Sequence, residues 1–231
     1  MTIPKNQVQK TNKIKRCYIA GAGEFCENRL PEQGDYIIAA DGGYTVLKKH
    51  GITPDLIVGD FDSLGEDAGL LQSLYDHPNV IRSPVEKDDT DMMLAVKQGL
   101  KRGFKTFIIN GGLGGRLDQT FANIQILVYL VKNGATGLLH GKETSMTAVK
   151  DGTVVLTPGV SRNAVISVFS YNAKAHGVTL KGMKYPLNNA VISNSYPIGI
   201  SNEFIGVNAV ISVQKGILII MFPGDSRLLA K

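Results

Sequence analysis

The sequence predicts an α/β domain built on a mainly parallel sheet, followed by an all-β domain that is either a sandwich or a barrel. Up to about residue 140, short apolar runs alternate with longer helix-compatible stretches, which is typical of successive β-α units. From about residue 141, short β-prone pieces follow one another between turn residues, and no helical pattern interrupts them. We therefore predict a flexible basic tail over 1–16, an α/β domain over 17–140 and an all-β domain over 141–231.

The individual elements follow from composition and periodicity. Strands of the first domain are expected where Ile, Val, Tyr or Phe gather, mostly ahead of glycine or acidic residues, at 17–20, 36–40, 55–58, 80–82 and 106–109. Helices are expected between them, at 43–50, 66–75, 89–102 and 117–133, and the last two have the clearest helical period. The strands expected in the second domain are 144–149, 153–156, 164–170, 177–180, 207–213 and 217–222.

The charge distribution argues against nucleic-acid binding. The net charge of +5 comes from the tail, which carries five basic residues and no acidic one, so the rest of the chain holds 20 basic and 20 acidic side chains. Residues 17–140 hold 16 acidic against 11 basic side chains. Such a domain is poorly suited to gripping a phosphate backbone unless cations are added.

The sequence also gives no indication of a membrane or secreted protein. No run approaches the roughly 18 apolar residues of a spanning helix, and residues 1–16 are polar where a signal peptide would be apolar. Cys17 and Cys26 have no second pair to complete a metal site, and we interpret them as free thiols in a reducing compartment. We expect a cytoplasmic protein.

Carboxylates follow most of the expected strands of the first domain. The carboxyl ends of parallel strands meet at one edge of an open sheet, where ligands bind, so these side chains are expected to gather there. A cluster of this kind repels itself unless a cation is bound, and Mg²⁺ prefers oxygen ligands together with substrate phosphates. The aspartates concerned are Asp41, Asp60, Asp62, Asp88, Asp89, Asp91 and Asp118.

Asp60 and Asp62 are candidates for a metal pair, since residues two apart in an extended chain point to the same face. An isolated Asp-x-Asp is more often two solvated loop residues, and it is the convergence with other loops that favours a metal. An aspartate or threonine just before Asp91 could simply cap the next helix, whereas Asp91 itself is the better metal ligand. Lys87 is either a phosphate contact or a solvated lysine.

Residues 110–118 read as a strand end, a glycine-rich turn and a helix start. Four glycines allow close backbone approach and can present N–H groups to an anion beside a helix N-terminus, with Arg116 and Asp118 directly after them. The segment is not a Walker A loop, and a tight turn without a ligand is the alternative. Gly21-Ala22-Gly23 is assigned no chemistry, and the four scattered histidines do not support a Ser-His-Asp mechanism.

Several segments together resemble the thiamine pyrophosphokinase family, in its bacterial form. The similarity runs from about residue 17 to the end, and Gly-Asp-Phe-Asp-Ser combined with Asp-x-Thr-Asp is quite specific. The segments are Asp41-Gly42-Gly43, the run 54–63 that contains Gly59-Asp60-Phe61-Asp62-Ser63, Lys87-Asp88-Asp89-Thr90-Asp91, Gly114-Gly115-Arg116-Leu117-Asp118-Gln119 and Gly199-Ile200-Ser201-Asn202-Glu203-Phe204.

The resemblance implies a C-terminal β-sandwich that binds thiamine and dimerises. It also implies transfer of the pyrophosphoryl group of ATP to the hydroxyl of thiamine, giving thiamine diphosphate and AMP, in a homodimer whose active sites lie between subunits. The implied Mg²⁺ ligands are Asp60, Asp62 and Asp91, the implied catalytic residues are Asp62, Asp91, Asp118 and Arg116, and the implied thiamine contacts are Ser201 and Asn202. The residues implied at the nucleotide are Asp41, Gly42, Lys87, Thr90, Gly111, Gly112, Gly114, Gly115 and Gln119.

The chain departs from the family pattern at two positions. Met93 stands where many bacterial relatives carry glutamate, Gln119 stands where many carry histidine, and no tryptophan is present to stack on thiamine.

Two other functions use the same residues differently. A metal-dependent nucleotide-sugar transferase would use Asp60 and Asp62 as its metal motif, whereas a non-catalytic module that senses thiamine or a nucleotide would have no reason to keep a repulsive carboxylate cluster.

Overall fold

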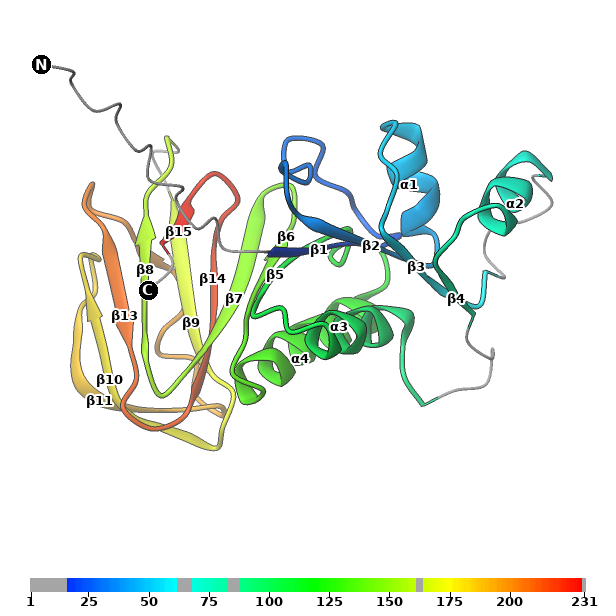
Figure 1. Ribbon diagram of the computed structural model, residues 1–231. Coiled ribbons are helices and arrows are strands. Elements are labelled where there is room, and N and C mark those ends of the chain that lie inside the picture. The colour runs from blue at the N-terminus through cyan, green and yellow to red at the C-terminus, as the bar shows by residue number, and fades with distance from the viewer. Residues whose placement is uncertain (1–15, 62–67, 83–87, 161–163, 230–231) are drawn as a thin grey trace, which may run out of the picture.

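A ten-stranded sheet runs through most of the molecule in the computed structural model, which describes residues 16–61, 68–82, 88–160 and 164–229 (Figure 1). The strand order is β12-β9-β14-β7-β6-β5-β1-β2-β3-β4. Six neighbouring strands of this sheet are parallel. They are β1 (Arg16–Ala20), β2 (Tyr36–Ala40), β3 (Leu56–Gly59), β4 (Val80–Arg82), β5 (Thr106–Asn110) and β6 (Thr136–His140).

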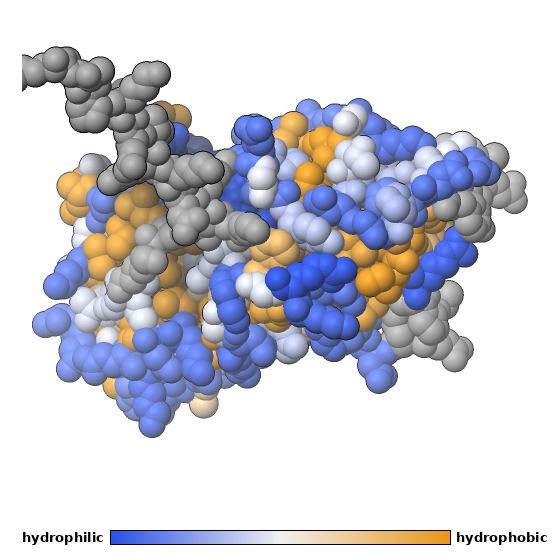
Figure 2. Space-filling view, viewed as in Figure 1, coloured by the Kyte–Doolittle hydropathy of each residue, from blue (hydrophilic) through white to orange (hydrophobic). Residues whose placement is uncertain are grey.

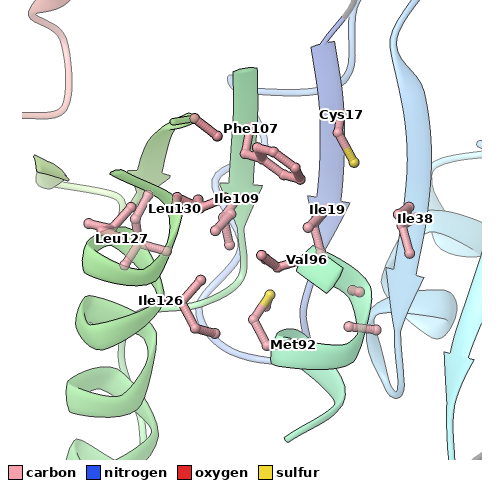
Figure 3. Close-up of a cluster of buried hydrophobic side chains, with 14 of the residues drawn as sticks. Cys17, Ile19, Ile38, Met92, Val96, Phe107, Ile109, Ile126, Leu127 and Leu130 are labelled. Atoms are coloured by element: carbon pink, nitrogen blue, oxygen red, sulfur yellow. The ribbon is translucent and has the colours of Figure 1, made fainter. Parts of the chain in front are cut away.

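Helices cover both faces of this parallel part. In Figure 1, α1 (Gly43–Lys49) and α2 (Ala68–Tyr75) lie on one side, and α3 (Asp91–Lys101) and α4 (Leu117–Lys132) lie on the other. The apolar stripe of α3 explains its docking, because Met92 and Val96 point at Ile19 and Ile109 of the sheet (Figure 3). Hydrophilic residues lie along the visible side of α3, as expected of an amphipathic helix (Figure 2).

The second part of the chain extends the same sheet and adds another to it. Strand β7 pairs antiparallel with β6, and β14, β9 and β12 continue outward, so the sheet passes without a break through residue 140. A five-stranded antiparallel sheet, β11-β10-β13-β8-β15, shares a core with this extension. The bounds are β7 (Thr144–Lys150), β8 (Thr153–Thr157), β9 (Val165–Ser170), β10 (Lys174–Lys181), β11 (Leu187–Ser193), β12 (Asn202–Glu203), β13 (Ala209–Ser212), β14 (Ile217–Pro223) and β15 (Arg227–Leu229).

The predicted fold class is confirmed: a mostly parallel α/β sheet with helices is followed by antiparallel β structure in a sandwich. Four observed strands were not predicted, namely β6, β11, β12 and β15. Strand β11 is mostly exposed and contains two asparagines, and β12 has only two residues, so neither carries a readable apolar pattern. No helix within the described residues is long and apolar enough to span a bilayer.

The buried histidine at the end of β6 makes stability depend on pH. His140 is 6% exposed, and burial, followed by the charges of Arg29 and Arg16, lowers its pKa to about 4. Because the unfolded chain binds this proton near pH 6.5, acid favours unfolding through that window. We expect His140 to remove up to about 3 kcal/mol of unfolding free energy between pH 7 and pH 4. Urea denaturation of the protein and of His140→Gln at several pH values tests this, and equal acid losses in both would contradict it.

Candidate active site

The order of the strands reverses between β1 and β5. The chain moves outward from β1 through β2 and β3 to β4, then returns to the other side of β1 with β5 and β6. In open α/β sheets, ligands bind in the crevice outside the carboxyl ends of the strands at such a reversal. A cavity of about 480 Å³ lies there, which is within the usual size of small-molecule sites. We call it the switch-point pocket.

Most residues expected at the nucleotide come together in this pocket. Its lining includes Asp41, Thr90, Asp91, Gly111, Gly112, Gly114, Gly115, Arg116 and Gln119. Gly42 is next to Asp41 as the N-cap residue of α1 and is not part of the lining. The lining also contains residues to which the sequence assigned no role, which are Gly21, Ala22, Gly23, Ala40, Met92 and Asn123.

Two glycine loops lie side by side at the bottom of the pocket. The N–H of Gly21 donates to the carbonyl of Asn110, and the N–H of Gly23 donates to the carbonyl of Gly111, both at 2.8 Å. Gly111 has a φ of +75°, and a Cβ at this position would lie 2.3 Å from the Gly21 carbonyl oxygen. Only glycine permits this approach, so the loop after β1 and the loop after β5 form one wall.

Two carboxylates from different strand ends face this pocket. Asp41 directly follows β2, lines the pocket and has a left-handed φ of 47°, a conformation that is uncommon for non-glycine residues. Asp91 is the first residue of α3. Thr90 is the cap of that helix, because its side chain accepts a hydrogen bond of 3.2 Å from the N–H of Met93. Asp91 therefore does not serve as the cap residue.

The remaining candidates, Asp60, Asp62 and Lys87, are described only in part. Asp60 follows β3, is partly buried and does not line the pocket, and Phe61 after it has a φ of 65°. Asp62 and Lys87 lie outside the described residues. Within the described ranges, no three His, Cys, Asp or Glu side chains converge as a metal site. The pair Asp41 and Asp91 nevertheless suits Mg²⁺, which usually takes one or two protein carboxylates and completes its shell with water and phosphate oxygens.

Arg116 and Asp118 form an ion pair with each other at the start of α4. The Arg116 guanidinium donates to Asp118 at 2.6 Å and 3.2 Å, and this hydrogen bond is the main cause that lowers the pKa of the Asp118 carboxyl. Both side chains are exposed to solvent. Arg116 lines the pocket and Asp118 does not, so the pair places the cation on the pocket side.

Two asparagines hold the glycine loops in place. Asn123, buried on α4, donates from Nδ2 to the Gly112 carbonyl at 2.7 Å. Asn110, fully buried at the end of β5, accepts from the Cys26 N–H at 2.8 Å. Neither was singled out from the sequence, although an asparagine inside an apolar helical stripe, as at 123, is a signal that could have been followed.

The expected thiamine contacts lie far from this pocket in the same chain. Ser201 precedes β12, which is the opposite edge strand of the long sheet, five strand spacings from β5. At about 4.8 Å a step, this amounts to roughly 24 Å. The Asn202 side chain is buried and exchanges hydrogen bonds of 2.9 Å and 2.7 Å with the backbone of Tyr185, while Ser201 is exposed.

A glycine-walled crevice lined by two carboxylates at a switch point, joined to a β-sandwich, suits a nucleotide-dependent transferase. The family model for the thiamin pyrophosphokinase catalytic domain matches residues 28–138, and that for the thiamin pyrophosphokinase vitamin B1 binding domain matches residues 153–218. The chain belongs to the thiamin pyrophosphokinase family, which confirms the resemblance and the expected class of enzyme.

Individual relatives agree with this assignment. Thiamine pyrophosphokinase of Bacillus subtilis (strain 168) is 33% identical over 206 residues, which cover 86% of this chain and 95% of that protein. The crystal structure of thiamine pyrophosphokinase from Bacillus subtilis superposes with a TM-score of 0.78 at 31% identity, covering 91% of this chain and 100% of the other. The corresponding structure from Geobacillus thermodenitrificans gives 0.77 at 28% identity, covering 91% and 98%.

Proposed function

We propose that pyrophosphoryl transfer from ATP to thiamine takes place at the switch-point pocket. The observation that carries this assignment is the meeting of Asp41 and Asp91, 50 positions apart in the sequence, at one cavity whose wall is glycine backbone. Phosphoryl-type transfer depends on in-line positioning and on neutralising phosphate charge rather than on a covalent protein group. The residues that line the pocket can contribute both to positioning and to charge neutralisation.

Each wall has a role in this reaction. The glycine loop after β5 allows the triphosphate to lie close to its backbone N–H groups, and Arg116 supplies a positive charge at the rim. The hydroxyl oxygen of thiamine forms a bond to the β-phosphorus while the bond from that phosphorus to the α–β bridging oxygen breaks, releasing AMP. The hydroxyl proton passes to a carboxylate, for which Asp91 or Asp62 is the candidate.

The carboxylates of this rim suit Mg²⁺. Asp91 and Asp41, together with Asp60 and Asp62 from the next strand end, would hold the ion. When bound, it would neutralise charge on the phosphate oxygens. Without a bound cation, the negative charge of these carboxylates would repel a triphosphate, and the single positive charge of Arg116 would not be sufficient to offset that repulsion.

The position of Ser201 supports an active site shared by two subunits of a homodimer. Ser201 and Asn202 lie roughly 24 Å from β5 within one chain, too far to contact a thiamine that reacts in the switch-point pocket. In a two-fold dimer, the edge near β12 of one subunit can cover the pocket of the other. Exposed apolar side chains suitable for burial surround this edge, namely Tyr185, Tyr196, Ile198, Ile200, Ile205 and Val207.

The reaction itself is tested by incubating the pure protein with thiamine, ATP and Mg²⁺. We expect thiamine diphosphate and AMP in equal amounts, and no product when EDTA is added. A nucleotide-sugar transferase would instead release a nucleoside diphosphate from a nucleotide sugar, and a sensing module would bind thiamine or nucleotide without turnover. Either result would overturn the proposed function.

Mixing two inactive variants tests the shared site. Asp91→Asn and Ser201→Arg would each disable both sites of their own homodimer. In a mixed dimer, one of the two sites would receive intact Asp91 from one subunit and intact Ser201 from the other, so random mixing is expected to restore about a quarter of wild-type activity. Thiamine diphosphate formation after mixing and subunit exchange is the measurement, and a site contained within one chain would give no recovery.

A further inference from the structure

A second cavity, of about 420 Å³, lies on the face of the sheet opposite α3 and α4. Its floor is formed by Ile108 of β5 and Leu138 of β6, and its walls come from the loop after β1 and from residues 226–229. We call it the sheet-face pocket. It shares no lining residue with the switch-point pocket, so the function proposed above does not account for it.

Two polar side chains of this pocket are buried without complete hydrogen bonding. His140 is 6% exposed, and its Nδ1 lies 3.0 Å from Ser145 Oγ, but its Nε2 has no hydrogen bond within the described part of the chain. Ser226 is 4% exposed, and its hydroxyl likewise has no partner among the described residues. Buried polar groups of native proteins are nearly always paired, so the unpaired Ser226 hydroxyl, with Nε2 of His140 in the same lining, indicates that this cavity suits a polar ligand.

The charges around the pocket favour an anion. Arg29 and Arg227 line it, and neither forms an ion pair with a carboxylate within the described ranges. Arg16 also lines it, but its guanidinium is already occupied by Asp35 at 2.6 Å and by Glu32 at 3.0 Å. The Glu32 carboxylate, which faces the same cavity, is therefore balanced by Arg16. Two guanidinium groups remain for a ligand.

Arg29 is held in position before any ligand arrives. Its carbonyl oxygen accepts from the Asn110 Nδ2 at 3.1 Å and from the Tyr18 hydroxyl at 2.9 Å, and its Nη2 donates to the Gly224 carbonyl at 2.5 Å. The other guanidinium nitrogens make no bond to any described residue. A fixed guanidinium with free donors binds an oxyanion at a lower entropic cost than a mobile one.

We propose that the sheet-face pocket binds an organic phosphate, with the oxyanion against Arg29, Ser226 and Nε2 of His140. The apolar part of the ligand lies along Ile108 and Leu138, since the cavity is larger than an oxyanion alone requires and its floor is apolar. In the tautomer in which Nδ1 of the neutral His140 ring accepts from the Ser145 hydroxyl, Nε2 carries the proton and can donate it to the phosphate.

The test follows the His140 ring by NMR in the full-length protein during titration with phenyl phosphate, with the resonance assigned from His140→Gln. We expect a saturable shift of the Cε1–H signal. Arg29→Gln is expected to weaken binding at least about tenfold, because a charge-assisted contact is lost. Ser226→Ala is expected to weaken it less, and Arg116→Gln in the switch-point pocket should leave the titration of His140 unchanged.

Three outcomes would overturn the proposal. One is the absence of a saturable shift, which would mean that water alone occupies the pocket. Another is a shift that neither Arg29→Gln nor Ser226→Ala weakens. The third is a shift that Arg116→Gln abolishes, which would place the ligand in the other pocket. If Arg29→Gln does not fold, Ser226→Ala decides alone, because its hydroxyl has no partner among the described residues that the substitution would remove.

Discussion

Replacing Asp91 by asparagine is expected to lower kcat/KM at least about a thousandfold while the fold stays intact. Asp91 lines the switch-point pocket, and asparagine has nearly the same shape but lacks the charge that the phosphate-bound cation requires. The helix keeps its cap, because Thr90 rather than Asp91 accepts from the N–H of Met93. Steady-state kinetics with thiamine and ATP, together with a thermal melt of each protein, measure both parts of the expectation.

Asp89→Asn is the matched control for this variant. Its carboxylate lies two residues away, pairs with Lys97 at 2.6 Å and does not line the pocket, so activity should stay within about twofold of the wild type. Activity of Asp91→Asn within tenfold of the wild type would contradict the role of this carboxylate, as would an equal loss in both variants.

Gly111→Ala is expected to destroy activity through the backbone rather than through a charge. The new Cβ would lie 2.3 Å from the Gly21 carbonyl oxygen, and the φ of +75° is itself unfavourable for alanine. The two glycine loops would have to separate, which would remove the wall along which the triphosphate lies. We expect a loss of roughly 3 kcal/mol or more in unfolding free energy, and little or no product.

Gly103→Ala is the control that separates the backbone strain of a positive φ from the steric clash of a new Cβ. Gly103 has a φ of +86°, yet a Cβ there would meet no atom within 4 Å. It should cost only about 1 kcal/mol and leave kinetics unchanged. Urea denaturation and turnover are measured on both variants. Similar stability losses in the two, or an active Gly111→Ala protein, would show that the close approach of the loops is not required.

The sequence was sufficient for those parts of the site that depend on local rules. The apolar stripe of α3 and the placement of Asp41 and Asp91 after strands follow from periodicity and from the common edge of parallel strands. Long-range pairing was not accessible in this way. The close approach of Gly21 and Gly111 joins segments 90 positions apart in the sequence, and nothing in Gly21-Ala22-Gly23 alone distinguishes a pocket wall from an ordinary turn.

Other features depend on competition between neighbouring groups. Asp118 was expected at the metal-binding edge, but it forms an ion pair with Arg116, two residues before it, and does not itself line the pocket. Its role in catalysis stays a prediction.

Strand β6 was missed because Thr136–His140 follows α4 after a very short turn, and the five residues contain one glycine and one histidine. Only its pairing with β5 on one side and with β7 on the other identifies it as a strand in the middle of the sheet.

A crystal structure with Mn²⁺ and a non-hydrolysable ATP analogue tests the central claim most directly, because manganese gives an anomalous signal and replaces magnesium at oxygen sites. We expect the manganese peak beside the carboxylates of Asp41 and Asp91, with the phosphates along the loop from Gly111 to Gly115. A nucleotide bound elsewhere, with Asp41 and Asp91 both free of metal, would contradict the account.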